Sequence, residues 1–246
     1  MQSKQAASHL VAAGVLALAL AGPAQAQYKE GDVKGGGSIT GAIKFDGAAP
    51  APKVFSVNKD KEVCGKSPIR DESLLVKGGG VVNVVVSLKG VASGKKWSTL
   101  PKAELDQKGC VYHPRIVVTK AGEDVTVLNN DNILHNVHTH PEKTGNPVAN
   151  IAQPKFRKKL TLAKRYFAKP GIVKLTCDVH DWMAGYAVIA ENPYVAVTGE
   201  GGKFEIKDVP AGSYTLEIWH ETLGMTTQKV EVKAGAATAV DLTLKK

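Results

Sequence analysis

LTCDVHDWM, residues 175–183, places a cysteine, a histidine and a methionine three positions apart on one short segment. The alternating run 171–176 has the pattern of a β-strand, so a loop is predicted to begin where that strand ends. A second stretch, NNDNILHNVH at residues 129–138, also follows a strand-like run and carries His135 just beyond a polar turn. The two stretches therefore predict a β scaffold that presents functional side chains on its loops.

The side chains in these stretches are the ligands that an electron-transferring copper site uses. Such a site holds two imidazoles and a thiolate in one plane, with a weak axial thioether. Cys177, His180 and Met183 supply three of the four ligands, and His135 is the candidate for the fourth. In the alternative interpretation, Met183 and Trp182 are core residues and Cys177 is a buried thiol. That interpretation leaves the coincidence of all four ligand types unexplained.

Together the two stretches resemble the ligand motifs of the cupredoxins, and the Cys-x-x-His-x-x-Met spacing is similar to that of the amicyanins among them. The resemblance implies an all-β fold with a Greek-key β-sandwich and one type 1-like copper ion. It also implies a role for each ligand: His135 as the remote imidazole, Cys177 as the thiolate, His180 as the imidazole at the solvent edge and Met183 as the axial thioether.

The same resemblance implies roles for neighbouring residues. Asn136 is expected to bond across to the ligand loop, with Thr176 as its partner, and thereby to orient the ligands. The carbonyl group of Leu134 is expected opposite Met183 as a distant further neighbour of the metal. Trp182 is expected to help form an apolar docking patch around the His180 edge.

The chain has three cysteines, an odd number. In an exported protein, one disulfide would leave a single thiol that is either free or bound to a metal. Since Cys177 lies in the proposed ligand cluster, Cys64 and Cys110 are the predicted disulfide pair.

The N-terminus predicts export. Lys4 precedes an apolar run, residues 10–21, which ends at AQA, residues 24–26. This pattern is typical of a signal peptide, residues 1–26, cleaved after Ala26, and the run is too short to span a bilayer. The predicted location is therefore periplasmic or secreted. The net charge of +9 falls by one, to +8, with the loss of Lys4, which favours a redox partner protein with an acidic docking surface. No nucleic-acid-binding motif is present.

The rest of the chain reads as short strands between Gly, Pro, Asn and Asp turns. We expect strands at residues 38–45, 81–88, 115–120, 124–129, 171–176, 186–190, 194–198, 203–207, 213–219, 228–232 and 238–244. Segment 138–154 is expected to be a long loop, and segment 89–108 a loop or one short helix.

Residues 191–246 resemble the carboxypeptidase regulatory-like domain, a small transthyretin-like β-sandwich, through GEGGKF at 199–204 and PAGSY at 210–214. Such a domain opens with a strand like GSITGAI, which here lies far upstream at residues 37–43. Two arrangements stay open: segment 37–104 belongs to the cupredoxin, or it pairs with the C-terminal sandwich. The predicted division is a linker at 27–36, the β segment 37–104, a copper-binding core at 105–190 and the C-terminal sandwich at 191–246.

The favoured function is a single-electron carrier and not an enzyme. A copper-binding or delivery protein is the main alternative, and a mononuclear copper enzyme is a further one. His113 and His220 are interpreted as polar surface residues. His138 and His140 would share one strand face and could form a second copper site, although exposed loop residues are the favoured interpretation.

Overall fold

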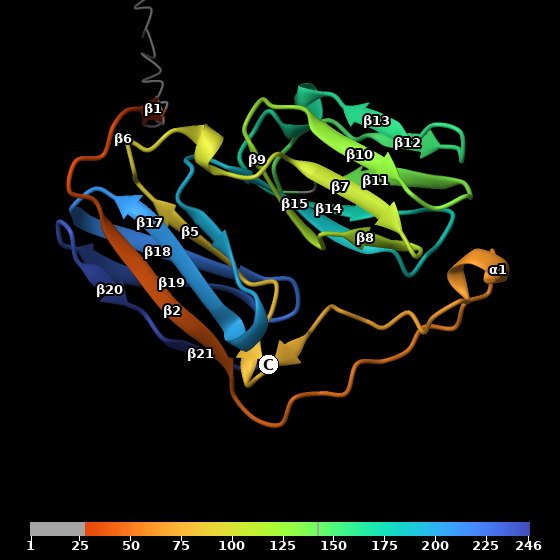
Figure 1. Cartoon of the computed structure of the whole chain (residues 1–246), viewed down its shortest axis with the longest axis horizontal. Coiled ribbons are helices and arrows are strands. Elements are labelled where there is room, and N and C mark those ends of the chain that lie inside the picture. The colour runs from red at the N-terminus through yellow and green to blue at the C-terminus, as the bar shows by residue number, and fades with distance from the viewer. Residues whose placement is uncertain (1–27, 142) are drawn as a thin grey trace, which may run out of the picture.

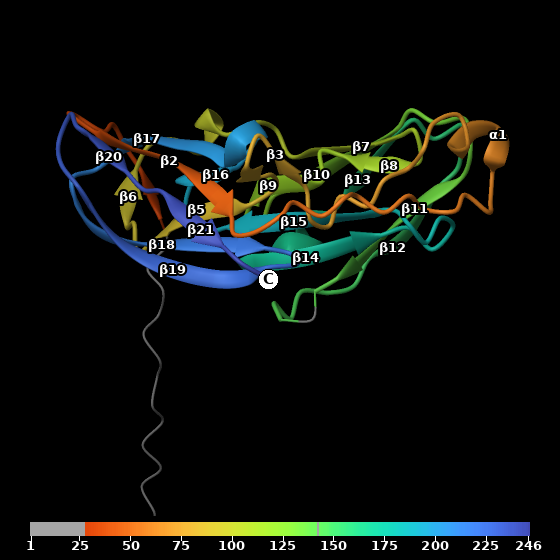
Figure 2. The ribbon, with the colours of Figure 1, turned by 90° about the horizontal axis from the view of Figure 1, so that it is seen from below.

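The computed structural model describes residues 28–141 and 143–246, so the predicted signal peptide lies outside the described residues. Within the described ranges the chain is almost entirely β. The helical elements are short: α1 (Lys61–Cys64) and the 3₁₀ turns η1 (Trp97–Thr99), η2 (Lys164–Phe167) and η3 (Glu200–Gly202). The all-β prediction is confirmed. Two β-sandwiches lie end to end along the long axis (Figures 1 and 2).

The first sandwich carries the two motif stretches. One sheet orders its four strands as β13 (Lys159–Leu162), β10 (Val125–Asn129), β7 (Glu104–Lys108) and β8 (Val111–His113). The other orders five strands as β12 (Asn150–Gln153), β11 (His135–His140), β14 (Gly171–Thr176), β15 (Ala184–Ala190) and β9 (Ile116–Lys120). Alternate side chains of β10 are buried, as a strand with one face on a core requires. Its inward residues Val125 and Val127 pack with Leu160, Leu162 and Leu175.

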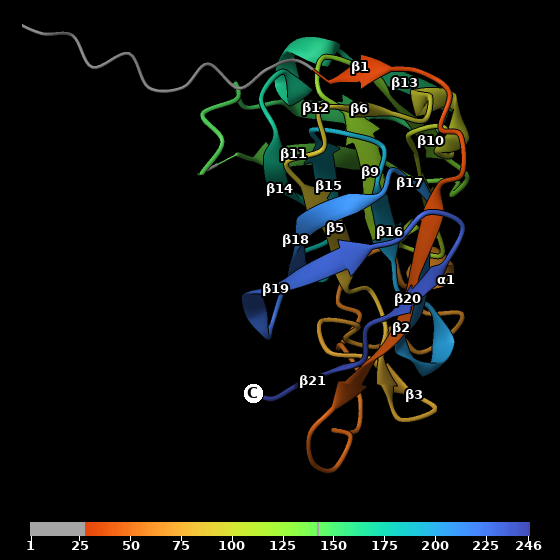
Figure 3. The ribbon, with the colours of Figure 1, turned by 90° about the vertical axis from the view of Figure 1, so that its left-hand side faces the viewer.

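The second sandwich is built from both ends of the described chain. One sheet orders β16 (Val195–Val197), β5 (Val85–Lys89), β18 (Gly212–His220) and β19 (Gly224–Val232). The other orders β17 (Lys203–Val209), β2 (Gly37–Phe45), β4 (Gly80–Val81) and β3 (Val76–Lys77), and β2 also pairs with β20 (Ala237–Ala239) and β21 (Leu242–Leu244). Figure 3 views this sandwich, where β20 runs alongside β2.

This strand pairing decides how the N-terminal segment is used. The strands β2 and β5 pair with strands of the C-terminal segment, and the strands of the first sandwich follow them in the chain. The region expected to be a linker, 27–36, contains β1 (Lys29–Glu30), which pairs in parallel with β6 (Ser93–Gly94). This short strand was not predicted, because the sequence around residue 30 is polar.

Five strands of the first sandwich were not predicted: β7, β8, β11, β12 and β13. The long loop expected at 138–154 is shorter, because β11 continues to His140 and β12 begins at Asn150. β11 reads HNVHTH and lacks the usual strand composition. Its Thr139 is nevertheless fully buried, and its hydroxyl accepts a hydrogen bond from the backbone N–H of Ala149. Tertiary burial therefore outweighs local composition in this strand.

An ion pair joins the two sandwiches. Arg115, just before β9, meets Glu221, in the turn after β18, through two parallel hydrogen bonds, of which Nη2 to Oε2 is 2.8 Å. The two side chains are only 11% and 8% exposed. The hydroxyl of Tyr186 also donates to Glu221, at 3.1 Å. Removing one partner of a buried, hydrogen-bonded ion pair is costly, because the other partner is left as an unpaired buried charge.

We therefore expect Glu221→Gln to lower the free energy of unfolding by about 3 kcal/mol, because Arg115 would keep a buried charge without its partner. Chemical denaturation measures this change. The matched control is Glu205→Gln, whose partner Lys207 and own side chain are 67% and 47% exposed, so its effect should stay below about 1 kcal/mol. Equal effects of the two substitutions would contradict a stabilising role of the buried pair.

Candidate metal centre

The register of two strands brings the motif stretches together. β11 and β14 are antiparallel neighbours, and His138 pairs with Thr176. His135, the first residue of β11, therefore lies at the same end of the sheet as Cys177, the residue after β14. The ligand loop then turns tightly, since the N–H of Met183 donates to the carbonyl oxygen of His180 at 3.0 Å.

Three of the four predicted ligands lie within reach of one metal ion. The Nδ1 atoms of His135 and His180 are 3.1 Å apart, and the sulfur of Cys177 is 3.8 Å from Nδ1 of His180. One donor atom from each of the three residues lies within 4.8 Å of the others. The three side chains are at most 2% exposed, and Met183, on the same turn, is 1% exposed.

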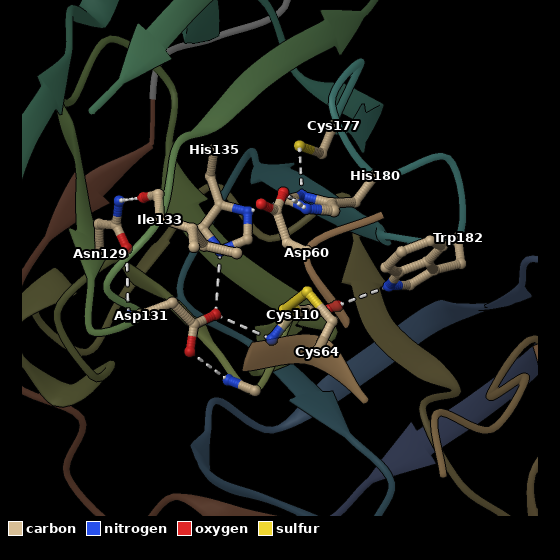
Figure 4. The surroundings of a disulfide bond; sticks show 11 residues. Asp60, Cys64, Cys110, Asn129, Asp131, Ile133, His135, Cys177, His180 and Trp182 are labelled. Atoms are coloured by element: carbon tan, nitrogen blue, oxygen red, sulfur yellow. Dashed lines mark hydrogen bonds and ion pairs between the residues drawn. A yellow bond between two sulfur atoms is a disulfide. The ribbon is translucent and has the colours of Figure 1, made fainter. Parts of the chain in front are cut away.

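Each imidazole is held by a carboxylate on its other nitrogen (Figure 4). Nε2 of His135 is 2.9 Å from Oδ2 of Asp131, and Nε2 of His180 is 2.9 Å from Oδ2 of Asp60. Hydrogen bonds from the His135 ring and two backbone N–H groups outweigh burial and lower the pKa of Asp131, so this carboxylate accepts. Both rings then donate a hydrogen bond through Nε2. The Nδ1 atom of each ring keeps its lone pair, which points at the Nδ1 atom of the other ring. Only a proton or a metal ion between the two atoms makes that arrangement favourable.

The donor distances fit a shared ion. With the bond lengths of zinc sites, about 2.0 Å to nitrogen and about 2.3 Å to sulfur, and bond angles of about 100–120°, two nitrogens would be about 3.1–3.5 Å apart and nitrogen and sulfur about 3.3–3.7 Å. The observed 3.1 Å and 3.8 Å lie at or close to these ranges. Carboxylates behind metal-binding imidazoles are a common arrangement that fixes the tautomer.

The sulfur of Cys177 is prepared to act as a thiolate. Burial would raise its pKa, but hydrogen bonds from His135, His180 and the backbone N–H groups of Asn136 and His180 outweigh burial and lower the pKa to about 6. The thiolate is the form that binds metals.

Asn136 connects the two ligand segments, although not through the predicted partner. Its Oδ1 accepts the backbone N–H of Asp178 at 2.7 Å, and its Nδ2 donates to Oδ1 of Asn150 at 2.8 Å. The prediction that Thr176 would be its partner is wrong, because Oγ1 of Thr176 instead lies 2.7 Å from Nε2 of His140. The side chain of Leu134 is 45% exposed beside the site.

Residues 53–71, here called the strap, run from the second sandwich along the first to its far end (Figure 1). Their two arms pair with each other through Phe55 N–H to the carbonyl oxygen of Ile69 and through a bridge between Val54 and Arg70. Cys64 at the end of α1 forms a disulfide with Cys110, the pair expected from the sequence. The disulfide thus ties the strap to the backbone that also holds Asp131, whose carboxylate accepts from the N–H of Cys110.

The strap corrects the predicted surface of the site. His180 was expected at the solvent edge, but it is 0% exposed because Asp60 of the strap covers its Nε2. Trp182 was expected in an apolar docking patch, but it is 6% exposed and its Nε1 donates to the carbonyl oxygen of Cys110. Both side chains are therefore interior.

Sequence reasoning missed Asp131 and Asp60. Asp131 could have been found, since it stands four residues before His135 in a polar turn. Asp60 carries no comparable signal, because it comes from a strap 120 residues away in sequence from His180.

The other histidines have different surroundings. His113 is exposed, as expected, but His220 is 1% exposed and burial lowers its pKa, so its interpretation as a surface residue is wrong. His138 and His140 lie on β11 and not on a loop, with ring centroids 4.3 Å apart. Nδ1 of His138 is 3.0 Å from Oδ1 of Asp178.

Comparisons with known proteins give one family match. The carboxypeptidase regulatory-like domain matches residues 180–245, which confirms the predicted resemblance of the C-terminal part of the chain to this family. The match begins inside the ligand loop and includes β15, which the strand pairing places in the first sandwich. No curated protein matches the chain.

Solved structures similar to part of the chain include three copper proteins. A purple cupredoxin from Nitrosopumilus maritimus is 19% identical, with 36% of this chain and 100% of that chain covered and a TM-score of 0.30. A mutant amicyanin in its Cu(I) form is 20% identical over 43% of this chain and 98% of that chain, with a TM-score of 0.31. A copper-containing nitrite reductase from Thermus scotoductus SA-01 is 18% identical over 37% of this chain and 23% of that chain, with a TM-score of 0.30.

We expect Asp131→Ala and Asp60→Ala each to weaken copper binding by about 10–100-fold, because each removes the carboxylate that orients an imidazole. Competition with a Cu(I) chelator measures the affinity. Asp178→Ala, which removes an exposed carboxylate next to Cys177, is the control and should change the affinity by less than about threefold. Unfolding of the metal-free variants is measured alongside, and unchanged affinity in both Asp131→Ala and Asp60→Ala would show that the carboxylates do not support the ligands.

Proposed function

We propose that this chain binds one copper ion through His135, Cys177, His180 and Met183 and transfers single electrons with it. The observation that carries the proposal is the pair of Nδ1 atoms 3.1 Å apart, each ring held from behind by a carboxylate, beside a thiol with a lowered pKa. A cation bound between the two Nδ1 atoms would stabilise this arrangement of the imidazoles.

The donor set favours copper over other metals. Two imidazoles and a thiolate with a thioether on the same turn are the ligand types of an electron-transferring copper site, whereas a structural zinc site is closed by further Cys or His ligands. Met183 supports this assignment, because it is buried at 1% exposure on the turn that follows His180. When bound, copper would supply a one-electron couple.

The surroundings favour electron transfer over delivery or catalysis. Asn136 holds the ligand loop to β11, and the disulfide-tethered strap covers His180, so the ligands keep one arrangement. A fixed arrangement lowers the structural change that accompanies each electron transfer. A delivery protein needs a site that opens, and an enzyme needs room for a substrate at the metal. The four proposed ligands are all at most 2% exposed, and this burial favours neither a delivery protein nor an enzyme.

The proposed location is outside the cytoplasm. The predicted signal peptide and the disulfide support this, because disulfides persist in oxidising compartments. Among the described residues, no helix has the length and apolar character needed to cross a membrane.

We expect the copper-loaded protein to show an intense sulfur-to-copper charge-transfer band, and Cys177→Ser to abolish it. Met183→Leu should keep the band and raise the reduction potential by about 60 mV or more, because losing an axial donor weakens binding of the oxidised ion relative to the reduced one, about 59 mV per tenfold. Visible spectroscopy and voltammetry measure both effects.

Met225→Leu is the matched control, since Met225 lies in β19 of the second sandwich and is 56% exposed. Its band and potential should equal those of the parent protein. A band that survives in Cys177→Ser would rule out the proposed ligand set.

A further inference from the structure

The turn between β12 and β13 carries an unusual surface. Residues 154–159 read PKFRKK, and Phe156 is 82% exposed, the most exposed large apolar side chain of the described residues. The four charged residues of this segment are all basic and exposed: Lys155, Arg157, Lys158 and Lys159. None of them forms an ion pair with another described residue.

This turn lies at the metal end of the first sandwich. His135, the first residue of β11, pairs with Gln153, the last residue of β12. Leu128, near the end of β10, pairs with Lys159, the first residue of β13. The intervening turn therefore emerges where β11 begins, and Leu134, 45% exposed, stands directly before His135.

A short polar connection links the turn to the site. Nζ of Lys158 donates to the carbonyl oxygen of Asp131 at 3.2 Å, and the carboxylate of Asp131 holds Nε2 of His135. The opposite imidazole offers no such approach, because Asp60 and the strap cover His180. An electron partner thus finds exposed apolar and basic side chains near His135 and a closed surface over His180.

We propose that Leu134, Phe156 and the four basic residues of 154–159, here called the basic–aromatic patch, form the docking surface for an acidic redox protein. The inference rests on the proposed function. With copper bound, the site would supply one electron from Cu(I) to the oxidised one-electron centre of the partner, such as a haem iron, which would leave Cu(II) and the reduced partner. The reverse transfer would use the same surface. Unpaired basic charges steer an acidic partner, and a central exposed aromatic ring supplies the apolar contact.

An acidic protein fits this surface better than an anionic membrane. Two apolar side chains, Leu134 before β11 and Phe156 between β12 and β13, offer little area for insertion into lipid. Their position next to His135 favours a partner that exchanges electrons with the metal at this imidazole.

The first test measures charge steering with ferricyanide, an anionic one-electron oxidant. In the reduced copper protein, Lys155→Glu/Arg157→Glu should slow the second-order reaction at least about fivefold at low ionic strength, and salt should diminish the difference. Lys229→Glu/Lys233→Glu makes the same change in net charge in the second sandwich and should slow the reaction less than about twofold. Equal slowing by the two double variants would overturn the patch assignment.

The second test measures the apolar contact with an acidic c-type cytochrome as the partner. Phe156→Ala should slow electron transfer to the cytochrome about fivefold or more and leave the ferricyanide rate unchanged, whereas Met225→Ala should change neither rate. An unaffected cytochrome rate in Phe156→Ala would overturn the proposal. So would binding to phosphatidylglycerol vesicles that Phe156→Ala abolishes while the cytochrome rate stays the same, because the patch would then be a membrane contact.

Voltammetry on every variant separates the two proposals. If the parent protein shows no reversible one-electron couple, the proposed function fails and the docking proposal fails with it. If the couple is present with the same reduction potential in all variants, differences in rate report on the docking surface alone.

Discussion

The structure depends on two imidazole rings whose Nδ1 atoms face each other across 3.1 Å. Buried lone pairs repel unless a cation or a shared proton lies between them, so the surrounding protein has to hold the rings in place. It does so with Asp131 behind one ring and Asp60 behind the other. The disulfide joins Cys64, on the strap that carries Asp60, to Cys110, whose backbone N–H donates to the carboxylate of Asp131. The site is therefore a closed unit, in which ligand orientation, strap position and disulfide are mechanically connected.

The scaffold explains how such remote residues meet. β11 and β14 are antiparallel neighbours, so the start of one and the end of the other share an edge, and the ligand loop closes over that edge. The second sandwich supplies β2 before the strap and β3 after it, and it thereby anchors both ends of the segment that brings Asp60 to His180. The buried pair of Arg115 and Glu221 joins the two sandwiches. The C-terminal segment thus helps to anchor the strap that covers the candidate metal centre, because its strands β17, β20 and β21 pair with β2.

Sequence patterns predicted the parts of this arrangement that local chemistry determines. The spacing of Cys177, His180 and Met183 and the strand-like runs around them are local signals, and 171–176 is a strand with those same bounds. β11 was missed because its polar residues are buried only through tertiary contacts, and His180 was placed at the surface because nothing in the sequence indicates that the strap covers it. Asp60 could not be found for the same reason, since its role exists only in the folded chain.

The most direct measurement of the central claim is copper-edge X-ray absorption fine structure of the copper-loaded protein. For a site assembled from His135, Cys177 and His180 we expect two nitrogen scatterers at about 2.0 Å, with the outer-ring pattern of imidazole, and one sulfur scatterer at about 2.3 Å. A shell made only of nitrogen and oxygen, or a shell with a single imidazole, would contradict a site assembled from His135, Cys177 and His180.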